Sequence, residues 1–444
     1  MKEAPPQMLR SMAEEDMTAE AALAVGQAVG KSYRAVCVGS DADPGSGMVK
    51  AALVGGLLSA GARVGDAGIV PAPAAALASA GYGCLLMVGG PDGQGRAGRV
   101  RIMRPDGSPL PEGRLREMAA HAERTPLPGH EGVGRLQGLC SVAEDYARAV
   151  VGRRGGSVDA PVILDCGRGS ASACAPRILE AAGADLTTID AHRGHRPPGP
   201  GGGGPARLAE IMGMELGSIG VALNGDGTRL ALFDEDGRHV DPEGTLALML
   251  LYLRPSSVVV PFDASALVDD AFMGLAGEGV RTGAAYGGGR RLIRAGNDLA
   301  SVTEAVRGSG AELGAMADGT FIFPDLTLCP DAISAAVVLA RMSGENNMGD
   351  LLASFPRYTA LKESVRGIRN AESFGRRLGD RLRELGADGG MAVDGRRVCM
   401  EGGWFAISQA PGDPGRVDVK AEARDRAYAV SMMEMAKDIA RGCM

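Results

Sequence analysis

The sequence contains no serine, threonine or cysteine between residues 85 and 105. This stretch consists of an apolar run, a loop that reads Gly-Gly-Pro-Asp-Gly at residues 89–93, and a second strand-like run at residues 99–103. The stretch therefore offers no hydroxyl or thiol that could serve as a nucleophile. The loop positions that remain are Gly90, Pro91 and Asp92.

Basic charge, long hydrophobic runs and paired cysteines are also missing. The net charge of −7 predicts no nucleic-acid partner and no anionic membrane partner. No apolar run approaches the roughly 20 residues that cross a bilayer, and residues 1–23 lack a hydrophobic signal segment, so we expect a cytoplasmic location. The eight cysteines form no Cys-x-x-Cys pair, which favours reduced thiols in apolar cores.

The 444 residues are too many for one hydrophobic core, so several domains are expected. Three times a short apolar strand is followed by a turn of small residues and a helix: strands 34–39, 161–165 and 257–261, with helices 47–60, 173–182 and 264–275. This alternation predicts right-handed βαβ units with parallel or mixed sheets. The C-terminal part instead predicts two helices, three strands and a closing helix: residues 350–355, 372–385, 395–400, 403–407, 417–421 and 425–440.

The fold class that follows is α/β. We predict three tandem α/β domains with mixed sheets at residues 1–150, 151–254 and 255–356, followed by a C-terminal α+β domain at residues 357–444.

Several short motifs occur in a familiar order along this plan. They read Gly-Ser-Asp at residues 39–41, Gly-Ile-Val-Pro-Ala-Pro at 68–73, Pro-Asp-Gly-Ser at 105–108 and Phe-Ile-Phe-Pro-Asp at 321–325. In order and spacing over nearly the whole chain, they resemble the α-D-phosphohexomutases of the archaeal type, a family that includes phosphomannomutase, phosphoglucomutase and phosphoglucosamine mutase. The resemblance implies phosphoryl transfer through a serine in a Thr-Ala-Ser-His-Asn-Pro-like loop. Gly90, Pro91 and Asp92 stand in that place here.

The family's metal loop, Asp-Gly-Asp-x-Asp-Arg, corresponds to residues 224–229, which read Asn-Gly-Asp-Gly-Thr-Arg. The resemblance makes Asn224, Asp226 and Thr228 the candidate metal ligands, and Asp226 alone among them is a carboxylate. Because Mg²⁺ is usually fixed by carboxylates and substrate phosphates, we expect weak Mg²⁺ binding and no other cofactor. The alternative interpretation is an ordinary β-hairpin loop.

The two loops that contact the substrate in this family are altered as well. The sugar loop, Gly-Glu-x-Ser-Gly-His in the family, leaves Asp318 and Thr320 as polar side chains within residues 314–320. The phosphate loop, Arg-Pro-Ser-Gly-Thr-Glu-Pro in the family, reads Ser-Gln-Ala-Pro-Gly-Asp-Pro at residues 408–414. By resemblance, the candidate ligand-binding residues are Arg10, Arg229, Asp318, Thr320, Ser408 and Arg416.

Phosphohexomutase chemistry needs a nucleophile, a metal ion and an anion clamp, and the sequence lacks the usual group for each. We therefore predict that the chain is not an enzyme but a non-catalytic homologue. It would bind a phosphosugar or another anionic metabolite, form a homodimer, or serve as the partner subunit of an active enzyme. The alternative is an active intramolecular phosphotransferase on a phosphosugar with a rebuilt site, in which Asp92, Asp226 and Asp318 are the remaining acids and Asp92 is a candidate nucleophile.

Overall fold

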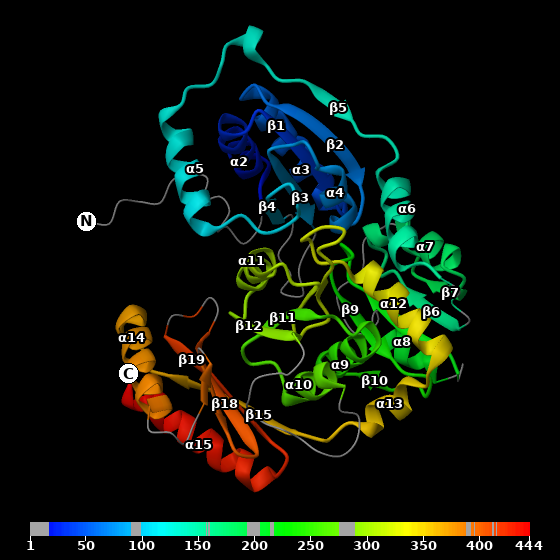
Figure 1. Ribbon diagram of the computed structural model, residues 1–444. Helices are drawn as coiled ribbons and strands as arrows, with labels where there is room; N and C mark the ends of the chain where they lie inside the picture. Colours follow the sequence, from blue (N-terminus) through cyan, green and yellow to red (C-terminus); the bar gives the residue numbers. More distant parts are fainter. Residues whose placement is uncertain are drawn as a thin grey trace. The chain divides into compact units, whose positions relative to one another are not determined.

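The computed structural model describes residues 17–89, 99–156, 158, 160–192, 205–213, 217–274, 289–387, 392–394, 396–410, 413 and 415–444. The chain forms two compact units: Met1–Asp241 with Val306–Gly314 and Asp318–Gly349, and Pro242–Ala305 with Ala315–Ala317 and Asp350–Met444. Helices alternate with strands of several sheets, which confirms the predicted α/β class (Figure 1). The domain boundaries at residues 150, 254 and 356 stay a prediction.

The first unit begins with a five-stranded sheet in the order β4-β3-β1-β2-β5. Its strands are β1 (Ala35–Ser40), β2 (Arg63–Ile69), β3 (Cys84–Gly89), β4 (Arg99–Met103) and β5 (Leu136–Gly138). The neighbours pair in parallel except β3 and β4, which are antiparallel and bring Gly89 opposite Arg99. The accompanying helices are α2 (Ala19–Ser32), α3 (Pro44–Ser59), α4 (Ala72–Ala78), α5 (Glu112–Arg124) and α6 (Val142–Arg154).

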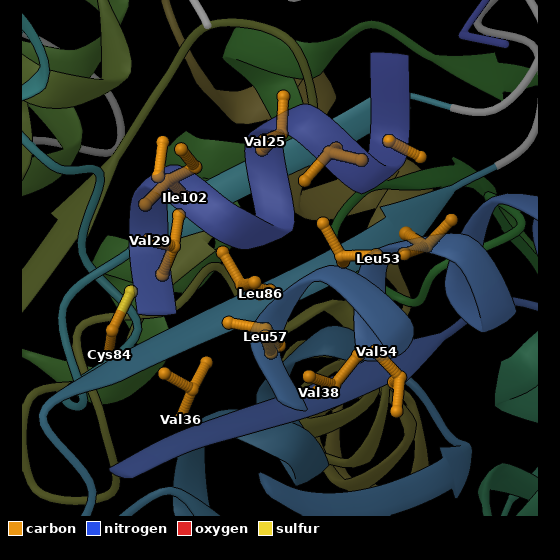
Figure 2. Packing of buried hydrophobic residues seen from close by; sticks show 14 of the residues in the cluster. Val25, Val29, Val36, Val38, Leu53, Val54, Leu57, Cys84, Leu86 and Ile102 are labelled. Atoms are coloured by element: carbon orange, nitrogen blue, oxygen red, sulfur yellow. The ribbon is translucent and has the colours of Figure 1, made fainter. Parts of the chain in front are cut away.

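Helices α2 and α3 begin at side-chain caps and bury one apolar face each. The Thr18 hydroxyl accepts from the backbone N–H of Ala21, and Asp43 caps α3 in front of Pro44. Figure 2 shows valines of α2 and leucines of α3 meeting apolar side chains of β1, β3 and β4 in one buried cluster. This packing holds the end of β3 at Gly89 beside the start of β4 at Arg99.

A second five-stranded sheet in the first unit has the order β10-β9-β8-β6-β7. Its strands are β6 (Pro161–Asp165), β7 (Asp185–Ile189), β8 (Ile219–Leu223), β9 (Leu230–Phe233) and β10 (His239–Val240), with helices α7 (Ala175–Ala181) and α8 (Pro205–Met212). Strand β6 pairs in parallel with β7 and β8, whereas β8-β9 and β9-β10 are antiparallel. From the later chain, β14 (Phe321–Ile322) and α12 (Ala332–Glu345) belong to this unit.

The predicted helix at residues 173–182 is shorter than expected. A 3-10 turn covers Ser170–Ala173, Cys174 leaves helical geometry at φ −143°, and α7 then starts at Ala175. Pro176 explains the break, because proline lacks a backbone N–H and fits only the first turn of a helix.

In the second unit, β11 (Ser257–Pro261) pairs in parallel with β12 (Arg291–Ala295). The helices around these strands are α9 (Pro242–Leu253), α10 (Ala266–Met273) and α11 (Leu299–Ser309), of which the last continues into the first unit. Strand β13 (Leu313–Ala315) and helix α13 (Met348–Ser354) also lie at the points where the chain changes unit.

The C-terminal part is an antiparallel sheet in the order β15-β19-β18-β17-β16 with two helices. Its elements are β15 (Thr359–Arg366), α14 (Ala371–Ala387), β16 (Ala392–Asp394), β17 (Arg397–Met400), β18 (Gly403–Gln409), β19 (Arg416–Ala423) and α15 (Arg426–Gly442). The two helices bury Phe374, Leu378 and Met432 with Phe405 and Val419 of the sheet. Among the described residues, no helix combines the length and apolar character needed to cross a membrane.

Candidate active site

Residues 224–229 form the loop between β8 and β9 of the first unit. Leu223 and Leu230 face each other in the antiparallel register, and the backbone N–H of Asn224 donates to the carbonyl of Arg229 at 3.0 Å. Gly227 has φ +71°, and a Cβ atom at this position would lie 3.0 Å from Pro71. The turn therefore requires glycine at this point.

Three separate segments of the first unit hold this loop in place. Three backbone N–H groups donate to three successive loop carbonyls: Ser170 to Gly225 at 2.8 Å, Ala72 to Asp226 at 2.9 Å and Ala332 to Gly227 at 3.0 Å. The donors come from the turn after β6 and from the first residues of α4 and α12. The loop position is thus fixed by the protein backbone.

The start of α12 is itself held by a buried hydrogen-bond network. Tyr146 of α6 donates to Asp331 Oδ1 at 2.6 Å, and the same oxygen accepts from the backbone N–H of Ser334 at 2.8 Å. Burial raises the pKa of the Asp331 carboxyl above its ordinary value, although these hydrogen bonds act in the opposite direction. Asp331 therefore positions the helix terminus that supports Gly227.

The polar side chains of the loop hydrogen-bond to one another. Asp226 Oδ1 accepts from Asn224 Nδ2 at 2.9 Å, from the Thr228 hydroxyl at 2.6 Å and from the Thr228 backbone at 3.2 Å. Asn224 Oδ1 accepts from the backbone N–H groups of Thr228 and Arg229 at 2.8 and 2.9 Å. The structure thus brings the three predicted metal ligands together, in an arrangement in which each is a partner of the others.

Arg101 of β4 supplies the cation of the site, and the sequence analysis missed it. Its guanidinium Nη2 donates to Asp226 Oδ2 at 2.5 Å. Burial raises the pKa of the Asp226 carboxyl, but the Arg101 charge and the hydrogen bonds from Thr228 and Asn224 outweigh burial, so the pKa lies below its ordinary value. An arginine inside β4, the strand that starts after residue 98, was the available signal.

These residues do not fit the Mg²⁺ ion that the resemblance implies. Mg²⁺ binds through oxygen ligands, carboxylates above all, whereas this loop offers one carboxylate whose two oxygens already accept hydrogen bonds. Within the described part of the chain, no cluster of three or more histidine, cysteine, aspartate or glutamate side chains is arranged to hold a metal ion.

Two of the predicted sugar-loop residues lie beside the same loop. Asp318 forms an ion pair with Arg229 at 3.3 Å, and its Oδ1 accepts from the backbone N–H of Thr320 at 3.2 Å. The carbonyl of Gly319 accepts from Leu230 at the start of β9 at 3.1 Å. The side chains of Arg229 and Asp318 are exposed, whereas Thr320 is buried.

The other predicted residues lie in the second unit or outside the described residues. Ser408 and Arg416 belong to the second unit, on β18 and β19, where Arg416 Nε lies 3.2 Å from Asp418 Oδ1. Arg10, Gly90, Pro91 and Asp92 lie outside the described residues. Strand β3 ends at Gly89 and β4 begins at the paired Arg99, so Arg101 follows two residues after the stretch that contains Asp92.

Known proteins similar to this chain span almost its entire length. The family model described as phosphoglucomutase/phosphomannomutase, α/β/α domain I, matches residues 7–126. A probable phosphoglucosamine mutase of Methanosarcina barkeri is 27% identical over 98% of this chain and 97% of its own length. Another from Methanocella arvoryzae is 28% identical over the same shares. The crystal structure of a phosphoglucomutase/phosphomannomutase family protein from Burkholderia thailandensis has a TM-score of 0.74 at 20% identity, covers 96% of this chain and 94% of its own, and supports the fold.

The comparisons correct the predicted function. We predicted a non-catalytic homologue and no enzyme, and this prediction is wrong, because the relatives that align from end to end are named as mutases. The error was to count lost motif side chains without the groups that replace them, since Arg101 contributes a positive charge beside Asp226. The matching domain model, the relatives of similar length and the shared fold all support the α-D-phosphohexomutase family for this chain.

Proposed function

We propose that this protein is an active intramolecular phosphotransferase that acts on a phosphosugar, with phosphoglucosamine as the first candidate substrate. The observation that carries the proposal is the alignment with probable phosphoglucosamine mutases, which covers 98% of this chain and 97% of each relative. The loop at residues 224–229 supports it, because several segments of the first unit hold this loop and its Asp226 pairs with Arg101 of β4.

Movement of a phosphoryl group between two hydroxyls of a sugar requires a group that receives it in between. Between residues 85 and 105, Asp92 is the one side chain that can act as a nucleophile. In our proposal the Asp92 carboxylate attacks one phosphorus of the sugar bisphosphate, forming an acyl phosphate as the bond from that phosphorus to the sugar oxygen breaks, and the released oxygen takes a proton from solvent. The free hydroxyl of a sugar monophosphate then attacks this acyl phosphate and loses its proton to solvent, which regenerates the bisphosphate and the carboxylate.

The remaining predicted residues are assigned to ligand binding. Arg229, Asp318 and Thr320 lie together in the first unit, and we assign to them the hydroxyl groups of the sugar. As phosphate-binding candidates we propose Ser408 and Arg416 in the second unit and, separately, Arg10, because hydroxyl and guanidinium groups suit phosphate oxygens. The eight cysteines are unpaired thiols, which supports a reducing, cytoplasmic location.

The proposal is tested by the turnover of hexosamine and hexose 1-phosphates, with the matching bisphosphate as activator, followed by ³¹P NMR with Mg²⁺ and with EDTA. We expect conversion to the isomeric monophosphate. Asp92→Asn should lower the rate by several orders of magnitude, as losses of nucleophiles do. The matched control, Asp236→Asn, removes an exposed acid that pairs with Arg238 and should leave the rate unchanged.

Each result has a defined meaning. Absence of turnover by folded wild-type protein with every substrate, in both Mg²⁺ and EDTA, would overturn the proposed function. Turnover that persists in Asp92→Asn would overturn the role of Asp92 and keep the function.

A further inference from the structure

The Arg101 guanidinium pairs with Asp226, the one carboxylate in the loop that by resemblance would hold a divalent cation. We propose that Arg101 takes the functional place of that cation, and that the phosphotransfer site of this chain works without a bound metal ion. The part of this inference that concerns metal binding stands on the geometry alone, whereas its catalytic consequence rests on the proposed function.

The first argument is the number of donors that Asp226 already accepts. A carboxylate offers roughly four acceptor positions. Among the described residues, Oδ1 accepts from Asn224 Nδ2 and from the hydroxyl and backbone N–H of Thr228, and Oδ2 accepts from Arg101. Oδ1 is therefore fully used, and a metal ion at Oδ2 would have to share that oxygen with the Arg101 guanidinium.

The second argument is the orientation of the two neutral side chains. The oxygen of the Asn224 amide faces the backbone N–H groups of Thr228 and Arg229, so its NH₂ group faces Asp226. The reversed amide would place two more N–H groups against backbone donors. The Thr228 hydroxyl donates its proton to Asp226. Both side chains therefore present hydrogen atoms where a cation needs oxygen lone pairs.

The third argument is the balance of charge. One carboxylate and one guanidinium cancel, and the guanidinium keeps its charge at every physiological pH. A dication at Asp226 would be repelled by the adjacent Arg101, and neither Asn224 nor Thr228 carries a compensating charge. The replacement of two loop carboxylates by neutral side chains thus agrees with the replacement of a dication by a single arginine charge.

The fourth argument is that Arg101 has hydrogen-bonding capacity to spare. A guanidinium carries five N–H groups in one plane and suits phosphate oxygens. Among the described residues, the Arg101 guanidinium donates to Asp226. Arg101 pairs in register with Met87, two positions from the paired Gly89 and Arg99 that bound residues 90–98. A guanidinium held there can neutralise a phosphoryl group without an added ion.

The test of metal binding uses Mn²⁺ as the probe, titrated into the full-length protein and followed by the loss of the free-ion EPR signal. We expect no stoichiometric Mn²⁺ binding by the wild type. A triple variant, Asn224→Asp/Thr228→Asp/Arg101→Gln, restores three loop carboxylates and removes the guanidinium, and it should bind one Mn²⁺ that Mg²⁺ displaces. One Mn²⁺ per wild-type chain, lost in Asp226→Asn and kept in the control Asp236→Asn, would overturn the inference.

The catalytic consequence is tested separately in the turnover assay. The wild-type rate should be the same in EDTA as in Mg²⁺, and Arg101→Gln should lower kcat about 10²- to 10³-fold, with partial recovery in Arg101→Lys. A wild-type rate abolished by EDTA and restored by Mg²⁺ would overturn the inference while confirming the proposed function. A chain without any turnover would instead contradict the proposed function, and the Mn²⁺ titration would still decide whether the loop holds a metal.

Discussion

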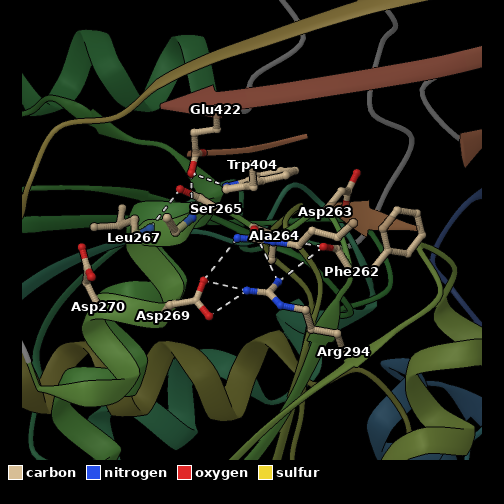
Figure 3. A network of polar contacts seen from close by, with 12 residues as sticks. Phe262, Asp263, Ala264, Ser265, Leu267, Asp269, Asp270, Arg294, Trp404 and Glu422 are labelled. Carbon is tan, nitrogen blue, oxygen red and sulfur yellow. Dashed lines mark hydrogen bonds and ion pairs between the residues drawn. The ribbon is translucent and has the colours of Figure 1, made fainter. Parts of the chain in front are cut away.

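The indole Nε1 of Trp404 donates a 2.9 Å hydrogen bond to Oε1 of Glu422, and the same oxygen accepts from the backbone N–H of Ala266 at 2.7 Å (Figure 3). Trp404 and Glu422 are 2% and 1% exposed, so water cannot replace either bond. The carboxylate therefore joins β18 and β19 to the first residue of α10 within the second unit.

We expect Glu422→Ala to destabilise the second unit by about 1–3 kcal/mol, because the buried indole N–H of Trp404 and the half-buried backbone N–H of Ala266 lose their acceptor. Glu422→Gln keeps a carbonyl oxygen in place and should cost less. Trp404 is the single tryptophan of the chain, so its fluorescence during urea unfolding reports on this unit alone. Glu372→Ala, which removes an exposed acid on α14, is the control. A Glu422→Ala midpoint equal to that of the wild type would contradict the expected role.

The close contact between α2 and α3 requires glycine at position 56 but not at the neighbouring position 55. A Cβ atom on Gly56 would lie 2.2 Å from the carbonyl oxygen of Leu23, whereas on Gly55 the nearest atom would be Leu23 Cδ1 at 3.8 Å. Gly56→Ala should thus force the helices apart and cost about 1–3 kcal/mol. Gly55→Ala should be neutral or stabilise by up to about 1 kcal/mol, because alanine is the better helix former. Thermal unfolding followed by circular dichroism compares the two variants, and equal Tm values would contradict the close helix contact.

Local sequence patterns predicted much of the fold. The strands at residues 161–165 and 257–261 occur with the expected bounds, because short apolar runs between turn residues are typical of buried strands in an α/β chain. The closing helix was predicted over residues 425–440; in the structure Asp425 caps it and accepts from the backbone N–H of Tyr428. Such signals lie within a few residues of the element that they specify.

The candidate site was less predictable, because its decisive contact joins distant residues. Arg101 on β4 and Asp226 in the loop between β8 and β9 are 125 positions apart, and neither residue type predicts the other. A motif comparison examines Asp226 only among its sequence neighbours, and so it registered two lost carboxylates without the arginine that balances them. That omission led to the wrong prediction that the chain is not an enzyme.

The cysteines give a prediction that depends on pH. Burial raises the pKa of the Cys37, Cys84 and Cys166 thiols to about 12, so at pH 8 only about one in 10⁴ of each is the reactive thiolate. A raised pKa keeps a thiol neutral to higher pH, so these three thiols should stay unreactive as the pH rises from 7 to 9. Cys140 is exposed and should react.

With a disulfide reagent such as DTNB, native protein at pH 8 should therefore show one fast thiol, and its rate should increase as the pH rises. Cys140→Ser should remove this fast phase, and Cys399, which is half-buried, should account for any slower one. After unfolding in urea, all eight thiols of the wild type should react, because burial no longer protects them. Several fast thiols in native protein, or a fast phase that survives in Cys140→Ser, would contradict the cores described for the two units.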